Sequence, residues 1–311
     1  MSQIADNITE LIGETPVLRL NRFSAACGCN TPILAKLECF NPGGSVKDRA
    51  LFGILRAALA DGRLQPGGNV IEISAGNQGS ALAMLCAAMG LSCTVILPDR
   101  TPRTTIERLR RYGANIVYAP ASQGLSGCRR LLDKMLKQDH YFVPDAFSND
   151  DNPQAHREGT AQELLRQVGQ IDYLVAGVGT GGTVTGCGEG IKMYCPDCIV
   201  IAVEPYASPV LSGGFPGSHP LTGIGPGFVA ENLNPYILDE VIRVKTPDSL
   251  EAVRLLARTE GLICGPSSGA ALDAAVMVAR RPEAVGKNVV AILPDRGEKY
   301  LEKDLERERK Q

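Results

Sequence analysis

Short apolar runs alternate with longer amphipathic segments along most of the chain. Apolar runs of about five residues are typical of strands that are buried on both faces of a parallel sheet. The runs expected to form strands are residues 33–37, 69–73, 93–97, 115–118, 173–176, 199–203, 241–244 and 288–293, with one more short strand after the turn that begins at residue 13. Strands that alternate with helices predict an α/β fold with twisted, mainly parallel sheets covered by helices on both faces.

The segments between these runs carry apolar residues three or four positions apart, as amphipathic helices do. Helices are expected over residues 79–89, 104–111, 125–136, 154–168, 183–193, 249–259 and 269–279, and from Val46 to a stop at Gly62. Residues 206–235 lack such a pattern and are rich in glycine, proline and serine. A loop of that length in a compact domain is usually functional or mobile.

The apolar pattern is interrupted near residues 147–153, where Ser-Asn-Asp-Asp-Asn-Pro follows a phenylalanine. A length of 311 residues also favours about two domains. We therefore expect an N-terminal α/β domain at residues 35–146 and a larger α/β domain made of residues 1–34 and 147–311.

The charge balance excludes two classes of partner. The chain has 32 lysine and arginine residues against 34 aspartate and glutamate residues, for a net charge of −2. This balance argues against a nucleic-acid or membrane-surface footprint. No apolar run is long enough to cross a bilayer, and the first residues are too acidic and polar for a signal peptide, so we expect a cytoplasmic protein.

Ten cysteines are scattered along the chain, and several, such as Cys86, Cys93 and Cys264, lie in apolar surroundings. In an intracellular chain they are most simply small buried hydrophobic residues. Cys195 and Cys198 have redox or metal-ligand spacing, but no second pair of cysteines or histidines stands at the distance of a zinc site. We expect a loop there and no metal.

The segment Asn41-Pro-Gly-Gly-Ser-Val-Lys-Asp-Arg49 joins turn formers to a helix start. Ser45 is expected to cap this helix, which places Lys47 in its first turn. The field at a helix N-terminus disfavours an ammonium group, so Lys47 is biased toward the free amine that forms Schiff bases. The alternative is a solvated lysine that merely lies near a helix start.

Residues 74–79, Ser-Ala-Gly-Asn-Gln-Gly, lie between a predicted strand and a predicted helix. Such a junction directs backbone N–H groups at an anion, such as a carboxylate. Asn77 adds a side chain that can hydrogen-bond a second ligand atom. The alternative is a tight turn in which Asn77 caps the helix.

Residues 177–183, Gly-Val-Gly-Thr-Gly-Gly-Thr, form a second junction of this kind. Small residues let the backbone approach a phosphate closely, and two threonine hydroxyls can supplement the N–H donors. The run also satisfies a dinucleotide-binding pattern through Gly177, Gly179 and Gly182, with Glu204 near the place of a ribose-binding acid. A nicotinamide-dependent oxidoreductase and a plain glycine turn are therefore alternatives for this loop.

The segment Gly265-Pro-Ser-Ser-Gly269 precedes the last long helix. A serine hydroxyl there could face a heteroaromatic nitrogen, or Ser268 could simply cap the helix. Together, a lysine, a carboxylate loop, a phosphate loop and a serine are what pyridoxal phosphate chemistry needs. They would supply a Schiff base, substrate anchoring, cofactor anchoring and a partner for the ring nitrogen.

With these motifs in order over nearly its whole length, the chain resembles the cysteine synthase (O-acetylserine sulfhydrylase) and cystathionine β-synthase family. These are pyridoxal phosphate enzymes of fold type II, like tryptophan synthase β. The most specific match is Asn41 to Arg49, and residues 223–228 match a glycine-rich loop beside the family's site. Residues 295–300 resemble the sulfhydrylase B branch.

The resemblance implies a role for each loop. Lys47 would form the Schiff base with pyridoxal 5'-phosphate and then remove the Cα proton of the substrate. Asn77 would contact the ring oxygen of the cofactor, and Ser267 would meet its pyridine nitrogen. The residues implied to hold the cofactor phosphate are Gly179, Thr180, Gly181, Gly182 and Thr183. This favours a phosphate monoester over a dinucleotide at the glycine loop.

The substrate side departs from the family's pattern. Where the family has Thr-Ser-Gly-Asn-Thr-Gly, residues 74–79 have Ala75 in place of the second residue and Gln78 in place of the fifth. Where the family has Gln-Gln-Phe-Ser-Asn, Asp145 and Ala146 replace the two glutamines. An ionised aspartate repels a carboxylate that an amide would bind. The substrate-binding residues implied by the resemblance are Ser74, Ala75, Gly76, Gln78, Asp145 and Gly223.

Two interpretations of this departure stay open. In one, backbone N–H groups still hold the substrate carboxylate and Asp145 turns away. In the other, the pocket is rebuilt, with Asp145 as a protonated donor, an acid or base at the β-carbon, or the partner of a cationic second substrate.

The function implied by the resemblance is β-replacement on an activated L-serine, such as O-acetylserine, by sulfide or a thiol, giving L-cysteine or a related amino acid. The alternative is β-elimination, as in a cysteine desulfhydrase or a serine/threonine dehydratase, because Ser-Ala-Gly-Asn also resembles dehydratases of this fold. A second alternative is regulatory binding of another protein's C-terminal tail, with a serine acetyltransferase-type partner. The resemblance also implies a homodimer.

Overall fold

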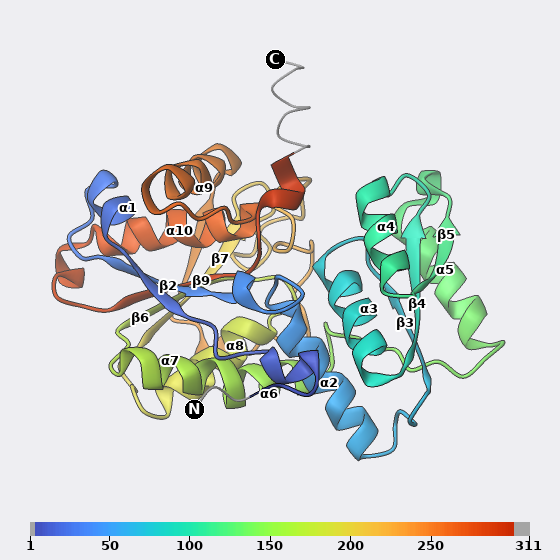
Figure 1. The fold of residues 1–311 in the computed structure, drawn as a ribbon. Helices are drawn as coiled ribbons and strands as arrows, with labels where there is room; N and C mark the ends of the chain where they lie inside the picture. The colour runs from blue at the N-terminus through green and yellow to red at the C-terminus, as the bar shows by residue number, and fades with distance from the viewer. Residues whose placement is uncertain (1–3, 302–311) are drawn as a thin grey trace.

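The computed structural model of the chain describes residues 4–301. Its strands form two separate sheets (Figure 1), one with the order β1-β2-β9-β6-β7-β8 and one with the order β3-β4-β5. Neighbouring strands run parallel, except that β1 is antiparallel to β2. The strands are β1 (Val17–Leu20), β2 (Ile33–Leu37), β3 (Asn69–Ile73), β4 (Ser92–Pro98), β5 (Asn115–Ala119), β6 (Tyr173–Gly177), β7 (Ile199–Pro205), β8 (Glu240–Val244) and β9 (Val289–Leu293).

Helices cover both faces of the larger sheet. Alternate residues of β7 face opposite sides: Ile201 and Val203 join one core cluster, and Val200 and Ala202 join the other. This follows from the two-residue period of a strand. The helices are α1 (Asn21–Ala26), α2 (Lys47–Ala60), α3 (Asn77–Met89), α4 (Arg103–Arg111), α5 (Gly124–Leu136), α6 (Asp151–Ala155), α7 (Ala161–Val168), α8 (Gly182–Lys192), α9 (Thr246–Glu260) and α10 (Pro266–Ala279). Helices α1, α9 and α10 lie on one side of this sheet, and α7 and α8 lie on the other (Figure 1).

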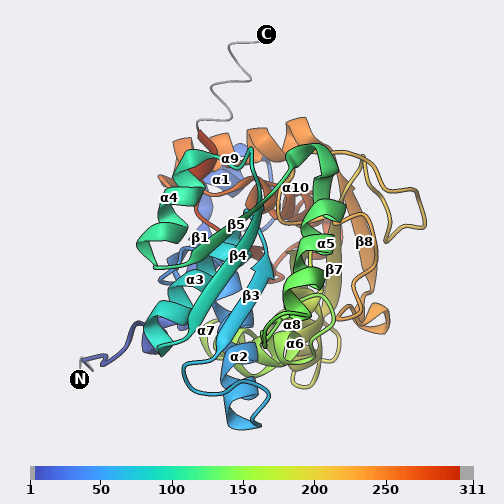
Figure 2. The same ribbon diagram turned by 90° about the vertical axis from the view of Figure 1, so that its right-hand side faces the viewer.

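The smaller sheet is built in the same way. Val70 and Val95 pack into a core cluster with α2, α3 and α4, whereas Ile71 and Ile96 pack against α5 on the opposite face. Figure 2 shows α3 and α4 on one side of this sheet and α5 on the other. The prediction of an α/β fold with two mainly parallel sheets is therefore confirmed.

Three local predictions need correction. Helix α2 begins at Lys47 with Val46 as its cap, and the Ser45 hydroxyl only accepts a long hydrogen bond of 3.4 Å from the Lys47 N–H. The helix expected at residues 154–168 begins earlier, at Asp151, and contains a π-helical turn at His156–Thr160 between α6 and α7. Helix α1 was not predicted, because its six residues carry too short an apolar pattern.

The expected domain boundary at residue 35 falls inside a strand of the larger sheet. Strand β2 pairs with β9 along its whole length and with β1 over residues 33–36, so residues 33–37 belong with the larger sheet. The boundary near residue 146 lies after Phe142, which pairs with Val70 at the edge of the smaller sheet. The division into two domains otherwise stays a prediction.

The cysteines pack as expected. Cys86, Cys93 and Cys264 are buried, and Cys195 and Cys198 join the core cluster of the larger sheet as free thiols. Within residues 4–301, no three cysteine, histidine, aspartate or glutamate side chains are grouped as a metal site would require. In the same part of the chain, no helix combines the length and apolarity needed to span a bilayer.

Candidate active site

The four predicted loops meet where the smaller sheet faces the larger one. Residues from α2, α3, the glycine loop after β6 and the start of α10 line one narrow cavity. Eight of the predicted site residues line it: Lys47, Asn77, Gly179, Thr180, Gly181, Thr183, Gly223 and Ser267. A second cavity of about 270 Å³ adjoins the first and shares Lys47, Asn77 and Gly223 with it.

Lys47 is the first residue of α2, and its Nζ lies 3.5 Å from the Thr180 hydroxyl. Burial lowers the pKa of Lys47 to about 8, although the nearby carboxylate of Glu72 acts in the opposite direction. A buried ammonium loses its hydration, which favours the neutral amine. The lysine is therefore not the solvated side chain of the alternative interpretation.

The glycine loop fits closely against its neighbours. A Cβ at Gly179 would lie 2.3 Å from the carbonyl oxygen of Gly223, and one at Gly182 would lie 2.1 Å from the amide oxygen of Asn152. Gly181 has φ +82°, a conformation that favours glycine. Gly182 begins α8 and does not line the cavity. The loop therefore requires glycine for backbone packing as well as for close approach to a ligand.

A buried histidine contacts Thr183 of this loop. His156 Nε2 lies 3.2 Å from the Thr183 hydroxyl, and His156 Nδ1 lies 2.9 Å from the Thr160 hydroxyl. Burial, assisted by the charge of Arg49, lowers the pKa of His156 to about 3. The ring is neutral at physiological pH, with one donor and one acceptor nitrogen for the two hydroxyls. Sequence reasoning missed this residue because its ring hydrogen-bonds a residue far along the chain.

A buried ion network holds the start of α2 against the larger sheet. Arg49 binds Glu38 through Nε at 2.6 Å and Glu163 through Nη1 at 2.6 Å, and Lys36 Nζ binds Glu163 at 2.7 Å. Burial alone would raise the pKa of Glu163, but Arg49 and Lys36 hold it at about 2. Because Arg49 lies two residues after Lys47, this network fixes the helix turn that carries the lysine.

The loop at residues 74–79 is closed by its own serine. The Ser74 hydroxyl accepts hydrogen bonds from Gly76 N at 3.2 Å and Gly79 N at 2.9 Å. Helix α3 begins at Asn77 with Gly76 as its cap, so the interpretation of Asn77 as a capping side chain is wrong. Ser74, Gly76 and Gln78 line the cavity of about 270 Å³, whereas Ala75 lines a third cavity beside it.

The side chain of Gln78 is engaged by a residue that sequence reasoning missed. Gln78 Nε2 donates to Glu72 Oε2 at 2.7 Å. Burial, together with the charge of Asp145, raises the pKa of Glu72. Sequence reasoning missed Glu72 because it lies inside an apolar run that predicts only a buried strand.

Asp145 is exposed and lines none of the three cavities. Its φ of +44° is uncommon for a residue with a side chain, and its Oδ2 accepts a hydrogen bond of 2.6 Å from the Ser148 hydroxyl. The structure thus places Asp145 apart from the other predicted substrate-binding residues, and its predicted role has no contact to support it.

A second polar cluster borders the site from the C-terminal side. Asp295 is fully buried, and its Oδ2 accepts hydrogen bonds from Asn77 Nδ2 at 2.8 Å and the Tyr300 hydroxyl at 2.7 Å. Lys299 Nζ lies 2.9 Å from the same oxygen and also binds Asn77 Oδ1. Burial and the charge of Asp295 raise the pKa of Tyr300. The sequence match at residues 295–300 marked this segment but not its contact with Asn77.

Ser267 lies at the second position of α10 and is almost fully buried where it lines the narrow cavity. The helix begins at Pro266, with Gly265 as its cap, so Ser268 does not cap it.

Glu204, the residue near the place of a ribose-binding acid, has protein partners of its own. Its carboxylate accepts hydrogen bonds from the backbone and hydroxyl of Ser212, at 3.0 and 2.6 Å, and orders the loop after β7. It is therefore not available to a ribose.

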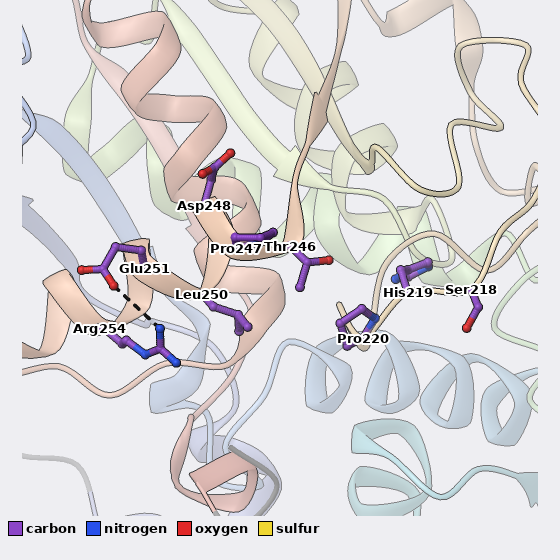
Figure 3. Close-up of a pocket in the computed structure, with 9 residues that line it drawn as sticks. All are labelled: Ser218, His219, Pro220, Thr246, Pro247, Asp248, Leu250, Glu251 and Arg254. Atoms are coloured by element: carbon purple, nitrogen blue, oxygen red, sulfur yellow. Dashed lines mark ion pairs between the residues drawn. The ribbon is translucent and has the colours of Figure 1, made fainter. Parts of the chain in front are cut away.

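A larger open hollow of about 920 Å³ lies elsewhere, between the start of α9 and residues 218–220 (Figure 3). It contains none of the predicted site residues. Glu251 pairs with Arg254 across one turn of α9, as the dashed line in Figure 3 marks. His219 Nε2 lies 2.9 Å from the carbonyl oxygen of Gly225. The chemistry of the four loops is thus confined to the adjoining cavities around Lys47.

The residues of the narrow cavity suit pyridoxal phosphate. An amine with a lowered pKa, two threonine hydroxyls, closely packed glycines and a buried serine match an aldehyde, a phosphate monoester and a pyridine ring. The model for the pyridoxal-phosphate dependent enzyme family matches residues 8–295. The chain belongs to this family. The oxidoreductase alternative is therefore wrong.

Known proteins are similar over nearly the full length of this family member. A cysteine synthase of Staphylococcus aureus is 42% identical, over 96% of this chain and 96% of that protein. The crystal structure of a cysteine synthase from Entamoeba histolytica has a TM-score of 0.94 at 39% identity, covering 97% of this chain and 91% of the other. A hydrogen sulfide-producing enzyme from Fusobacterium nucleatum has a TM-score of 0.91 at 32% identity, covering 96% and 99%.

Proposed function

We propose that this enzyme catalyses β-replacement on an activated L-serine, such as O-acetylserine, with sulfide or a thiol, giving L-cysteine or a related amino acid. The observation that carries the proposal is the meeting of Lys47, the glycine loop and Ser267 in one cavity that opens into another of about 270 Å³. The similarity to cysteine synthases over nearly the whole chain supports the same reaction.

Bound pyridoxal phosphate would withdraw electrons from the substrate Cα, so that the Cα–H bond and the bond to the β-substituent break more easily. The hydroxyls of Thr180 and Thr183 and the N–H groups of the glycine loop would hold its phosphate, and Ser267 would donate to its ring nitrogen. The amine of Lys47 accepts the Cα proton as the leaving group departs from Cβ with the bonding electrons. The sulfur nucleophile then bonds to Cβ, and Lys47 returns a proton to Cα.

The start of α3 is the proposed site for the substrate carboxylate, because backbone N–H groups of a helix N-terminus bind anions. The Nε2 group of Gln78 donates to Glu72, and the Asp145 carboxylate accepts from Ser148, so both groups are already engaged by protein partners. This supports the interpretation in which the backbone of residues 74–79 still holds the carboxylate, without help from Asp145.

β-Elimination is the second candidate function. The similarity to a hydrogen sulfide-producing enzyme favours it specifically. Both reactions use the same base and the same loss of the β-substituent. They differ in whether a sulfur nucleophile or water completes the reaction.

Product analysis separates the two candidates. The enzyme loaded with pyridoxal phosphate would be given O-acetylserine and sulfide, and separately cysteine alone, with cysteine, pyruvate and sulfide measured in each case. β-Replacement predicts cysteine as the main product of the first mixture. Pyruvate as the main product of the first mixture, with rapid sulfide release from cysteine in the second, would overturn the proposal in favour of elimination.

We also propose that the enzyme acts as a cytoplasmic homodimer and that its residues divide into the two expected domains, with residues 33–37 in the larger one. Regulation by the C-terminal tail of a serine acetyltransferase-type protein is proposed on the family resemblance alone. Light scattering would test the dimer, and co-purification with such a partner would test the complex.

A further inference from the structure

The third cavity, of about 260 Å³, lies directly beside the substrate cavity. The two share the residues Gly76, Asn77, Thr222 and Tyr300 in their linings. Its lining includes residues of α4 and the pair Lys299 and Tyr300 near the end of the described chain. A substrate held at the start of α3 can therefore extend into it.

The lining of this cavity combines apolar surface with several hydrogen-bond donors. Hydroxyl groups come from Ser80, Thr104, Thr105, Thr222 and Tyr300, and cations come from Arg108 and Lys299. No aspartate or glutamate belongs to its lining as far as the structure describes the chain. Donors and cations with no carboxylate among them suit an anionic group better than a cationic one.

The two cations of the cavity differ in their partners. Lys299 is neutralised by Asp295 at 2.9 Å and is held by Asn77. The guanidinium of Arg108, which is partly buried, has no carboxylate partner among the residues in the described part of the chain. Its neighbour Glu107 pairs with Arg111 instead, at 3.2 Å. Among the described residues that line this cavity, Arg108 is therefore the cation without a carboxylate partner.

We propose that Arg108 and the hydroxyl groups around it form a subsite for an acidic group that a substrate carries beyond its reacting β-carbon. A planar guanidinium binds a carboxylate or a phosphate through two parallel hydrogen bonds. The acidic group belongs either to the leaving group of the activated serine or to the incoming nucleophile. This proposal rests on the proposed function, because it assigns specificity at the same site.

Matched substrates test this assignment. For the leaving group, O-phosphoserine would be compared with O-acetylserine, with sulfide as the nucleophile. For the nucleophile, 2-mercaptoacetate would be compared with the neutral 2-mercaptoethanol, with O-acetylserine as the donor. Values of kcat/KM would be measured for the wild type, R108Q, R108K and the control R103Q, whose arginine lies on the same helix but outside this cavity.

In one of the two comparisons, we expect R108Q to lose at least about tenfold in kcat/KM for the anionic compound and less than about twofold for its neutral counterpart. R108K should retain part of the preference, and R103Q should retain all of it. The comparison that responds identifies which substrate carries the acid. An equal loss for both compounds, or no loss in either comparison, would overturn the subsite.

Failure of the proposed function would be recognised separately, because wild-type enzyme would then make no cysteine from O-acetylserine and sulfide. The subsite would still be tested by calorimetric titration of the enzyme, loaded with pyridoxal phosphate, with O-phosphoserine and separately with 2-mercaptoacetate. Binding of either compound at least about tenfold weaker in R108Q than in the wild type and R103Q would support the subsite, and equal binding of both compounds would contradict it.

Discussion

The cofactor side and the substrate side of the site are formed by different kinds of contact. On the cofactor side, backbone packs against backbone, as where Gly179 meets the carbonyl of Gly223, and buried charges fix the turn that carries Lys47. On the substrate side, cavities of about 270 and 260 Å³ are bordered by side chains with separate partners. The difference teaches that close packing limits which residues the cofactor side can accept, whereas a single side-chain substitution can change the shape or charge of the substrate side.

Replacement of Lys47 is the strongest way to break the cofactor side. K47A removes both the Schiff-base amine and the proposed base, so cysteine formation should fall at least about 10³-fold. The visible absorption of the bound cofactor should also disappear. Thermal unfolding within a few degrees of the wild type would show that the variant folds. Substantial turnover by the folded variant would contradict the role of Lys47.

The ion network under α2 should dominate stability on the cofactor side. R49M leaves Glu38 and Glu163 as buried carboxylates without their main cation, so the free energy of unfolding should fall by about 3–5 kcal/mol. Urea denaturation would measure it. The control is R63M, since Arg63 pairs with Asp61 at the surface and its loss should cost less than about 1 kcal/mol. Equal effects of the two substitutions would show that the buried network is not special.

The contact between His156 and Thr183 should affect cofactor binding without touching the substrate side. H156N removes the ring nitrogen that meets the Thr183 hydroxyl, and we expect about tenfold weaker binding of pyridoxal phosphate by the apoprotein. Titration followed by cofactor absorption would measure the affinity. The control, H140N, changes an exposed histidine. An unchanged affinity in H156N would show that His156 does not contribute to cofactor binding.

The lowered pKa of Lys47 predicts how cofactor uptake depends on pH. The neutral amine reacts with an aldehyde, and it becomes the main form above a pKa of about 8. The rate at which the apoprotein takes up pyridoxal phosphate should therefore rise about tenfold between pH 7 and pH 9. Stopped-flow absorption would record it. A rate that did not level off near pH 8 to 9 but continued to rise up to about pH 10.5 would show that Lys47 has an ordinary pKa.

The smallest effect is expected on the substrate side, at Asp145. Because this carboxylate is exposed and bound to Ser148, D145N should change the KM for O-acetylserine by less than about twofold. Steady-state kinetics would measure it. A change of tenfold or more would bring back the interpretation in which Asp145 acts on the substrate.

Local sequence patterns were sufficient for most of the fold, and they marked residues that the structure brings into one cavity. Strand β2 and strand β3 have the predicted bounds, because runs of apolar residues with turn formers at their ends define buried strands. Lys47, Asn77 and Ser267 meet in one cavity because the ends of strands and the starts of helices converge there.

The residues that sequence reasoning missed act through side-chain contacts that depend on tertiary packing, most of them between residues far apart in the sequence. Glu72 binds Gln78 across the end of β3, His156 meets Thr183, and Arg49 joins Glu38 to Glu163. None of these pairs has a characteristic spacing in the sequence, since their geometry depends on how helices and strands pack. Asp145 is the opposite case: its motif position predicted a substrate contact, whereas the structure places this exposed residue outside the cavities around Lys47.

The most direct test of the central claim is an absorption titration of the enzyme loaded with pyridoxal phosphate, first with O-acetylserine and then with sulfide. The account predicts that O-acetylserine shifts the visible band of the cofactor to longer wavelength, and that sulfide restores the starting spectrum with the release of cysteine. If O-acetylserine left the spectrum unchanged while added cysteine was consumed with release of sulfide, the site around Lys47 would not be a β-replacement site for this substrate.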